Sequence, residues 1–118
     1  MASANAIEVL RGQSYSRQFT FTKEDGTAFN LTGQTVYFRL FSPVDPNTHL
    51  LDYDSVAEAT KVVVVSAAGG VVRVDLAPAD TNRTARVYEY SMFALDVAGK
   101  KMALVDPEVF VVREGGIL

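Results

Sequence analysis

Four residues that could bind a metal ion or carry a proton lie close together: Asp45, His49, Asp52 and Asp54. A calcium-binding loop places oxygen ligands at alternate positions and a glycine at its sharp turn. The run Asp52-Tyr53-Asp54 has neither the third acidic position nor that glycine. We therefore interpret the segment as a polar, solvated loop and predict no metal site.

Other catalytic chemistry has few residues to draw on, because the chain has one histidine, His49, and no cysteine. The lack of cysteine excludes a thiolate nucleophile, a disulfide and an iron–sulfur cluster built from this chain. A serine nucleophile activated by histidine would depend entirely on His49. We expect no catalytic residue and no cofactor, so the chain is predicted not to be an enzyme.

Two short motifs also lack the context that their chemistry needs. The triplet Asn30-Leu31-Thr32 matches a glycosylation site, but no secretion signal precedes it, and we interpret Asn30 as a turn residue. The run Gly99-Lys100-Lys101 lacks the first glycine and the following helix of a phosphate-binding loop. Neither motif therefore indicates a binding site.

Length and charge narrow the possible partners. The chain has 118 residues, the size of one domain, with 48% hydrophobic residues and a net charge of −3. A protein that binds nucleic acid in general carries net positive charge, so the negative charge of this chain is unfavourable for that role. No apolar run is longer than that at 62–65, which is far below the roughly 20 residues of a membrane helix. We expect no nucleic acid, membrane or small-molecule partner, and synthesis in a cytosol-like compartment.

One group of residues has the chemistry of a protein interface. Tyr37, Arg39 and Phe41 alternate on the outward side of a predicted strand. Exposed aromatic rings beside arginine are enriched where proteins bind each other; cover by a loop is the alternative. We predict an interface at these residues and at the apolar Ile117 and Leu118, and expect the terminal residues 1–6 and 114–118 to contact other subunits.

Alternating apolar residues and regularly spaced turns predict strands as the elements that position these side chains. Helical turns are expected only at 55–58 and 78–81, and a loop at 42–47. In 86–97 the apolar side changes, which predicts either a bulge or a strand that is apolar on both sides. The predicted strands are residues 6–10, 15–22, 35–41, 49–53, 60–66, 71–76, 86–97, 102–105 and 108–113.

This order of elements predicts an all-β fold, a two-sheet antiparallel β-sandwich that forms a single domain with its core in residues 7–113. Phe38 and Tyr90 lie mid-strand on apolar sides, so we expect both to be buried. Arg17 shares a side with Phe19 and Phe21, where it either extends to the sheet end or pairs with a carboxylate. The strands at 6–10 and 108–113 are expected to be edge strands.

A resemblance adds to this pattern. Phe19-Thr-Phe21, an acidic turn ending at Gly26, Leu31-Thr-Gly33 and the alternating strand up to Leu40 resemble the opening hairpin of immunoglobulin-like domains in tailed-phage virion proteins. The baseplate upper protein N-terminal family is the closest that we can name. The second half agrees in Pro78-Ala-Asp80-Thr81, Tyr88-Glu-Tyr90, the Ala-Gly-Lys turn and the closing strand.

The resemblance covers about residues 7–113, and departs from the family where Arg86-Val87 replaces an expected glycine. It implies an immunoglobulin-like virion protein, made in the bacterial cytoplasm, that binds other virion subunits in the baseplate, tail or fibre attachment of a phage. A capsid decoration protein is one alternative. A carbohydrate-binding sandwich is another, although the chain has no tryptophan for a sugar-binding platform.

Overall fold

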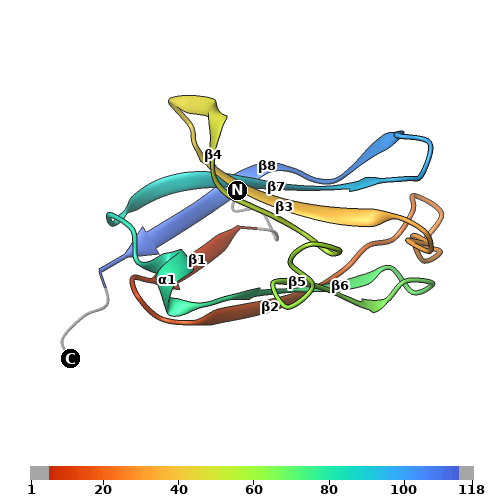
Figure 1. The fold of residues 1–118 in the computed structure, drawn as a ribbon, viewed down its shortest axis with the longest axis horizontal. Coiled ribbons are helices and arrows are strands. Elements are labelled where there is room, and N and C mark those ends of the chain that lie inside the picture. Colours follow the sequence, from red (N-terminus) through yellow and green to blue (C-terminus); the bar gives the residue numbers. More distant parts are fainter. Residues whose placement is uncertain (1–5, 115–118) are drawn as a thin grey trace.

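Two β-sheets pack face to face in the computed structural model, which describes residues 6–114 (Figure 1). Five strands form one sheet in the order β1-β8-β7-β3-β4, and three form the other in the order β2-β6-β5. The predicted all-β sandwich is therefore confirmed. The elements are β1 (Ile7–Leu10), β2 (Tyr15–Thr20), β3 (Thr35–Ser42), β4 (Asp45–Asp54), β5 (Val62–Ser66), β6 (Val71–Leu76), α1 (Pro78–Thr81), β7 (Arg86–Leu95) and β8 (Lys101–Arg113).

The strand order corresponds to that of immunoglobulin-like sandwiches, in which three strands face an extended second sheet. A tyrosine corner supports this assignment. Tyr88, near the start of β7, donates a hydrogen bond from its hydroxyl to the carbonyl oxygen of Thr84 at 2.8 Å. That contact fixes the connection from the three-stranded sheet to β7.

One strand pair departs from the predicted antiparallel arrangement. β1 pairs with β8 in parallel, with Ile7 opposite Phe110 and Leu10 opposite Arg113. The chain crosses to the other sheet after β1, so the partner of β1 is the last strand instead of its neighbour in sequence. β1 is an edge strand as predicted, but β8 lies between β1 and β7, so the prediction that 108–113 is an edge strand was wrong.

Aromatic side chains from both sheets meet in the core. Phe38 and Tyr90 are fully buried, as predicted. The ring of Tyr90 lies 5.5 Å from Phe38 and 6.2 Å from Phe110 in its own sheet, and 6.4 Å from Phe19 in the opposite sheet. Burial raises the pKa of the Tyr90 hydroxyl above its ordinary value. This ring therefore joins the two layers.

Arg17 lies on the inner side of β2 with Phe19, as the alternation predicts. The guanidinium group is 4.9 Å from the centre of the Phe19 ring, and Nη1 donates to the carbonyl oxygen of Ala6 at 2.9 Å. A backbone acceptor at the sheet end was not among the expected partners. The contact ties the segment before β1 to the other sheet.

β8 is one continuous strand, so the predicted break at Asp106-Pro107 was wrong. Instead, the pairing of β8 with β7 shifts register between the pairs Tyr90–Glu108 and Phe93–Ala103. A proline is tolerated where the ladder is already irregular. β7 itself pairs regularly with β3, so the second alternative for 86–97 holds: β7 is apolar on both sides.

The loop predicted at 42–47 is also a strand in part, because β4 begins at Asp45 opposite Ser42. Prolines there suggested a loop, but an edge strand tolerates them. The tip of this β3–β4 hairpin rises from the outer side of the five-stranded sheet (Figure 1). Residues 55–58 form turns and no helix; Asp54 Oδ1 accepts the N–H groups of Val56 and Ala57.

The two remaining local predictions are confirmed. α1 begins at Pro78, as expected for a helical turn with proline in its first position. Asn30 is a turn residue whose side-chain oxygen accepts the N–H of Thr32 at 2.9 Å.

The strands expected to reach Thr22 and Val97 end earlier, at Thr20 and Leu95.

Candidate functional site

Of the four potential metal ligands, only Asp52 and His49 contact each other, and Asp45 and Asp54 make separate local contacts. Asp45 accepts a hydrogen bond from Thr48 at 2.8 Å, and Asp54 caps the turn that follows β4. Asp52 lies 3.1 Å from Arg39 and 3.7 Å from His49. Within residues 6–114, no three carboxylate or histidine groups come together as a metal site would require.

A pair of aromatic rings stands on the outer face of the five-stranded sheet, the side that points away from the three-stranded sheet. Tyr37 of β3 lies opposite Phe93 of β7 in the register. Their ring centres are 4.7 Å apart and the planes differ by 8°, an offset-stacked geometry. Phe93 is only 7% exposed although it is outside the core.

Two cations lie over these rings. The guanidinium carbon of Arg39 is 4.8 Å from the centre of Phe93 and 5.7 Å from that of Tyr37. Lys101 Nζ, from the start of β8, is 4.3 Å from the Phe93 centre. Cations at such distances are attracted to the ring faces. We call Tyr37, Arg39, Phe93 and Lys101 the ring–cation cluster.

The structure thus brings together two of the predicted interface residues, Tyr37 and Arg39, but not the third. Phe41 is 7% exposed, so the expectation of an exposed ring there was wrong. The pairing of β3 with β4 shifts register on both sides of Phe41, at the base of the rising hairpin. The Phe41 ring is therefore buried although it lies outside the core. The other predicted interface residues, Ile117 and Leu118, lie outside the described residues.

Sequence reasoning missed Phe93 and Lys101 as part of this site. The available signal was the outward apolar side of 86–97, which begins at Phe93. Its neighbours could not be predicted from spacing, because Tyr37 and Lys101 come from two other strands. Only the register of three strands places them around one ring.

A pocket of about 220 Å³ lies next to the cluster, where β8 shifts register against β7. It is mainly apolar, with a lysine and an aspartate among its lining residues. The lining residues are Ser91, Met92, Phe93, Lys101, Ala103, Val105, Asp106 and Pro107.

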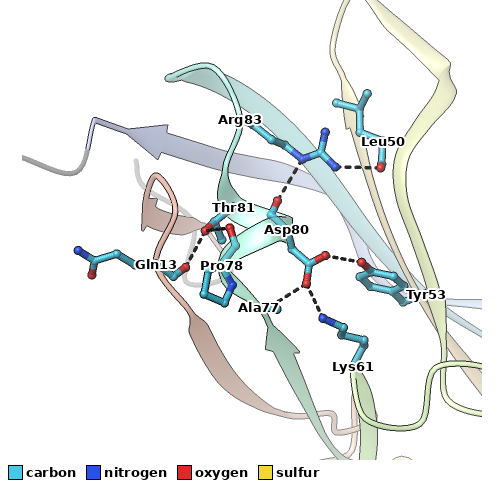
Figure 2. Close-up of polar contacts among 9 residues, drawn as sticks. All are labelled: Gln13, Leu50, Tyr53, Lys61, Ala77, Pro78, Asp80, Thr81 and Arg83. Atoms are coloured by element: carbon cyan, nitrogen blue, oxygen red, sulfur yellow. Dashed lines mark hydrogen bonds and ion pairs between the residues drawn. The ribbon is translucent and has the colours of Figure 1, made fainter.

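A second polar network, centred on the buried carboxylate of Asp80 in α1, connects the two sheets (Figure 2). Asp80 Oδ2 accepts from Lys61 Nζ at 2.8 Å and from the N–H of Ala77 at 2.8 Å. Asp80 Oδ1 accepts a hydrogen bond from the hydroxyl of Tyr53, which comes from β4 in the five-stranded sheet. We call Tyr53, Lys61 and Asp80 the Asp80 network.

Arg83 extends this connection, as Figure 2 shows. Its Nε donates to the carbonyl oxygen of Asp80 at 3.1 Å, and its Nη2 donates to that of Leu50 in β4 at 3.0 Å. On the other side of α1, the hydroxyl of Thr81 donates to the carbonyl oxygen of Gln13 at 2.6 Å. α1 is therefore fastened both to β4 and to the turn before β2.

The electrostatics of the Asp80 network favour an ionised aspartate. Burial alone would raise the pKa of Asp80, but the hydrogen bonds from Lys61, Tyr53 and Ala77 outweigh it and hold the pKa below its ordinary value. Burial, together with the hydrogen bond to Asp80, raises the pKa of Tyr53 to about 12. A carboxylate satisfied in this way stabilises the fold and is not exposed to a ligand.

The sequence matches no family model, and no curated protein is significantly similar to it. A membrane-spanning helix, long and apolar, is not found in the part of the chain that the structure describes. The function must therefore be argued from the fold and the outer face.

Proposed function

We propose that the chain is a structural component of a tailed-phage particle, in the baseplate, tail or fibre attachment, and binds other subunits through the outer face of its five-stranded sheet. The observation that carries this proposal is the ring–cation cluster. In this proposal the chain is made in the bacterial cytoplasm, ends in the virion and needs no catalytic residue or cofactor.

The cluster has the properties of an interface centre. Arginine and aromatic residues contribute most to binding in many protein interfaces. Here the rings are held in place by stacking, and Arg39 is held by Asp52, so little side-chain freedom would be lost on binding. The resemblance of residues 7–113 to virion domains supports a phage particle as the setting.

The same contacts weigh against the carbohydrate-binding alternative. A sugar-binding platform needs ring faces that are open to the ligand. Phe93 is covered by Tyr37, Arg39 and Lys101 and is nearly buried. A capsid decoration protein would use the same kind of contact as a tail protein, so the position in the particle distinguishes those two roles.

Purified particles from cells that express the chain test the proposal. Quantitative mass spectrometry should find it in a fixed ratio to a tail protein. Arg39→Ala should reduce incorporation about tenfold or more, because truncation of an arginine at the energetic centre of an interface costs about 2 kcal/mol or more. Absence of the wild-type chain from particles would overturn the proposal.

Arg73→Ala is the matched control. Arg73 lies on the outward side of β6 and pairs with Asp75 at 3.0 Å, as Arg39 pairs with Asp52. Among the described residues, no ring lies under its guanidinium, whereas Arg39 covers two. Equal losses for both variants would show that the outer face of the five-stranded sheet is not the specific contact.

A further inference from the structure

Two charged side chains on β8 stand at the pocket without an ion pair. Lys101 and Asp106 both line it and both are exposed. Neither takes part in any of the ion pairs found between residues 6 and 114. The surface thus carries one unpaired positive and one unpaired negative group on the same strand.

The two charges are separated by an apolar stretch. Five positions of extended chain place them up to roughly 17 Å apart along β8. Between and beside them lie the exposed Ala103 and Pro107, whereas Val105 and Phe93 of the same pocket are nearly buried. Farther along the same face, Val109 is 40% exposed. The order along the strand is therefore positive, apolar, negative.

This order of charges along β8 is complementary to the same order on a second copy whose β8 runs in the opposite direction. When two such faces are stacked with their β8 strands antiparallel, a twofold axis runs between them at a right angle to the strands. The positive end of each β8 then lies over the negative end of the other, which gives two opposite-charge pairs. Closed, twofold interfaces use the same patch on both subunits in this way. A partner with a single charge sign would leave one of the two groups unpaired.

We propose that this surface binds a second copy of the chain, with the two β8 strands antiparallel, so that Lys101 of each copy pairs with Asp106 of the other. The inference rests on the proposed role of the outer face as an interface, and it names one partner for that face. The exposed apolar residues of each copy, Ala103 and Pro107, would be buried between or beside the two pairs.

The shape of the face is compatible with this contact. The β3–β4 hairpin tip rises from the same side, but it lies away from the turn that joins β7 and β8, beside which Lys101 stands (Figure 1). The β7–β8 end of the sheet is therefore the open part of the face. Arg39 and Tyr37 lie next to it and remain available to another subunit.

Sedimentation of the pure full-length chain tests the proposal. The wild type should give a concentration-dependent species of twice the 12.8 kDa of one chain. Lys101→Glu and Asp106→Lys should each weaken the dimer at least about tenfold, because each places like charges opposite each other twice. Lys100→Glu is the matched control: it makes the same charge change in the adjacent turn, outside the pocket, and should leave the dimer intact.

Mixing the two single variants gives the decisive measurement. In a Lys101→Glu and Asp106→Lys heterodimer, both charge pairs are opposite in sign again, so the mixture should regain wild-type association. A wild type that stays monomeric at millimolar concentration would overturn the proposal. So would single variants that associate normally, or a mixture that remains monomeric while each variant melts as the wild type does.

This test is independent of the particle experiment. A chain that enters particles but never dimerises would refute only the dimer. A chain that dimerises as described but is missing from particles would refute only the proposed function.

Discussion

The Asp80 network and the ring–cation cluster each combine a tyrosine with a cation, but they occupy opposite sides of the β3–β4 pair. Tyr53 contacts Asp80 and Lys61, whereas Tyr37 stacks on Phe93 under Arg39. In the buried network the carboxylate accepts three hydrogen bonds. On the outer face, Arg39 and Lys101 rest on rings, and Lys101 has no carboxylate partner among the described residues.

If the outer face is an interface as proposed, similar residues serve stability in one place and binding in another. A buried, fully hydrogen-bonded charge is costly to disturb, because its partners would be left unpaired. An exposed cation on an aromatic ring contributes little to folding, since water can replace its contacts. We therefore expect substitutions in the two regions to separate loss of stability from loss of binding.

The largest effect is expected for Asp80→Ala. This change leaves Lys61, Tyr53 and the Ala77 N–H without their acceptor and should lower the free energy of unfolding by about 3 kcal/mol. Urea unfolding followed by circular dichroism measures it. A loss below about 1 kcal/mol would mean that the network does not hold the sheets together, and would remove the contrast between the two regions.

A smaller loss of unfolding free energy is expected for Tyr53→Phe, which removes only the hydroxyl. A hydrogen bond to a charged group contributes about 1.5–3 kcal/mol, and Lys61 and Ala77 still satisfy Asp80, so we expect a loss near the lower value. The matched control is Tyr37→Phe, whose hydroxyl is on the outer face. Its free energy of unfolding should stay within about 0.5 kcal/mol of the wild-type value. Equal losses for the two tyrosine variants would contradict the assignment of Tyr53 to the stabilising network.

Acid should act on the Asp80 network in a defined direction. The pKa of Asp80 is lowered in the folded chain, so its contribution to stability is complete above the ordinary value of 3.8 and is lost as the pH falls below it. Melting temperatures of wild type and Asp80→Asn should therefore differ most at pH 6 and converge toward pH 3. A difference that grows in acid would contradict this sign.

The smallest effect on stability is expected for Arg39→Ala. The Arg39–Asp52 pair is partly exposed, and such pairs contribute about 0–1 kcal/mol. The free energy of unfolding should thus change by less than about 1 kcal/mol, while incorporation of the chain into particles falls about tenfold or more. A loss comparable to that of Asp80→Ala would make Arg39 a structural residue and weaken the interface proposal.

Regular alternation was enough to predict most strands and the two central core residues. β2, β3 and β6 alternate cleanly, and Phe38 and Tyr90 are buried as expected. Prediction failed where proline was taken as a break, at Asp106-Pro107 and at the beginning of β4. Whether proline ends a strand depends on edge position and register, and both are tertiary properties.

Neither region compared here could be assembled from local sequence signals. Tyr53, Lys61 and Asp80 come from three separate segments, and a short helical turn was the only predicted feature of α1. The ring–cation cluster depends on Tyr37 lying opposite Phe93. Outward parity predicted the correct side of β3 for Tyr37, Arg39 and Phe41, but it could not show that the Phe41 ring is buried there.

The parallel pairing of β1 with β8 has a mechanical consequence. Tension between residues 6 and 114 would pull the two strands past each other lengthwise. The backbone hydrogen bonds of the pair, together with the Arg113–Glu8 contact at 2.8 Å and the Arg11–Glu114 contact at 3.0 Å, would share that load instead of opening one after another. A domain connected in this way resists being pulled apart from its two ends.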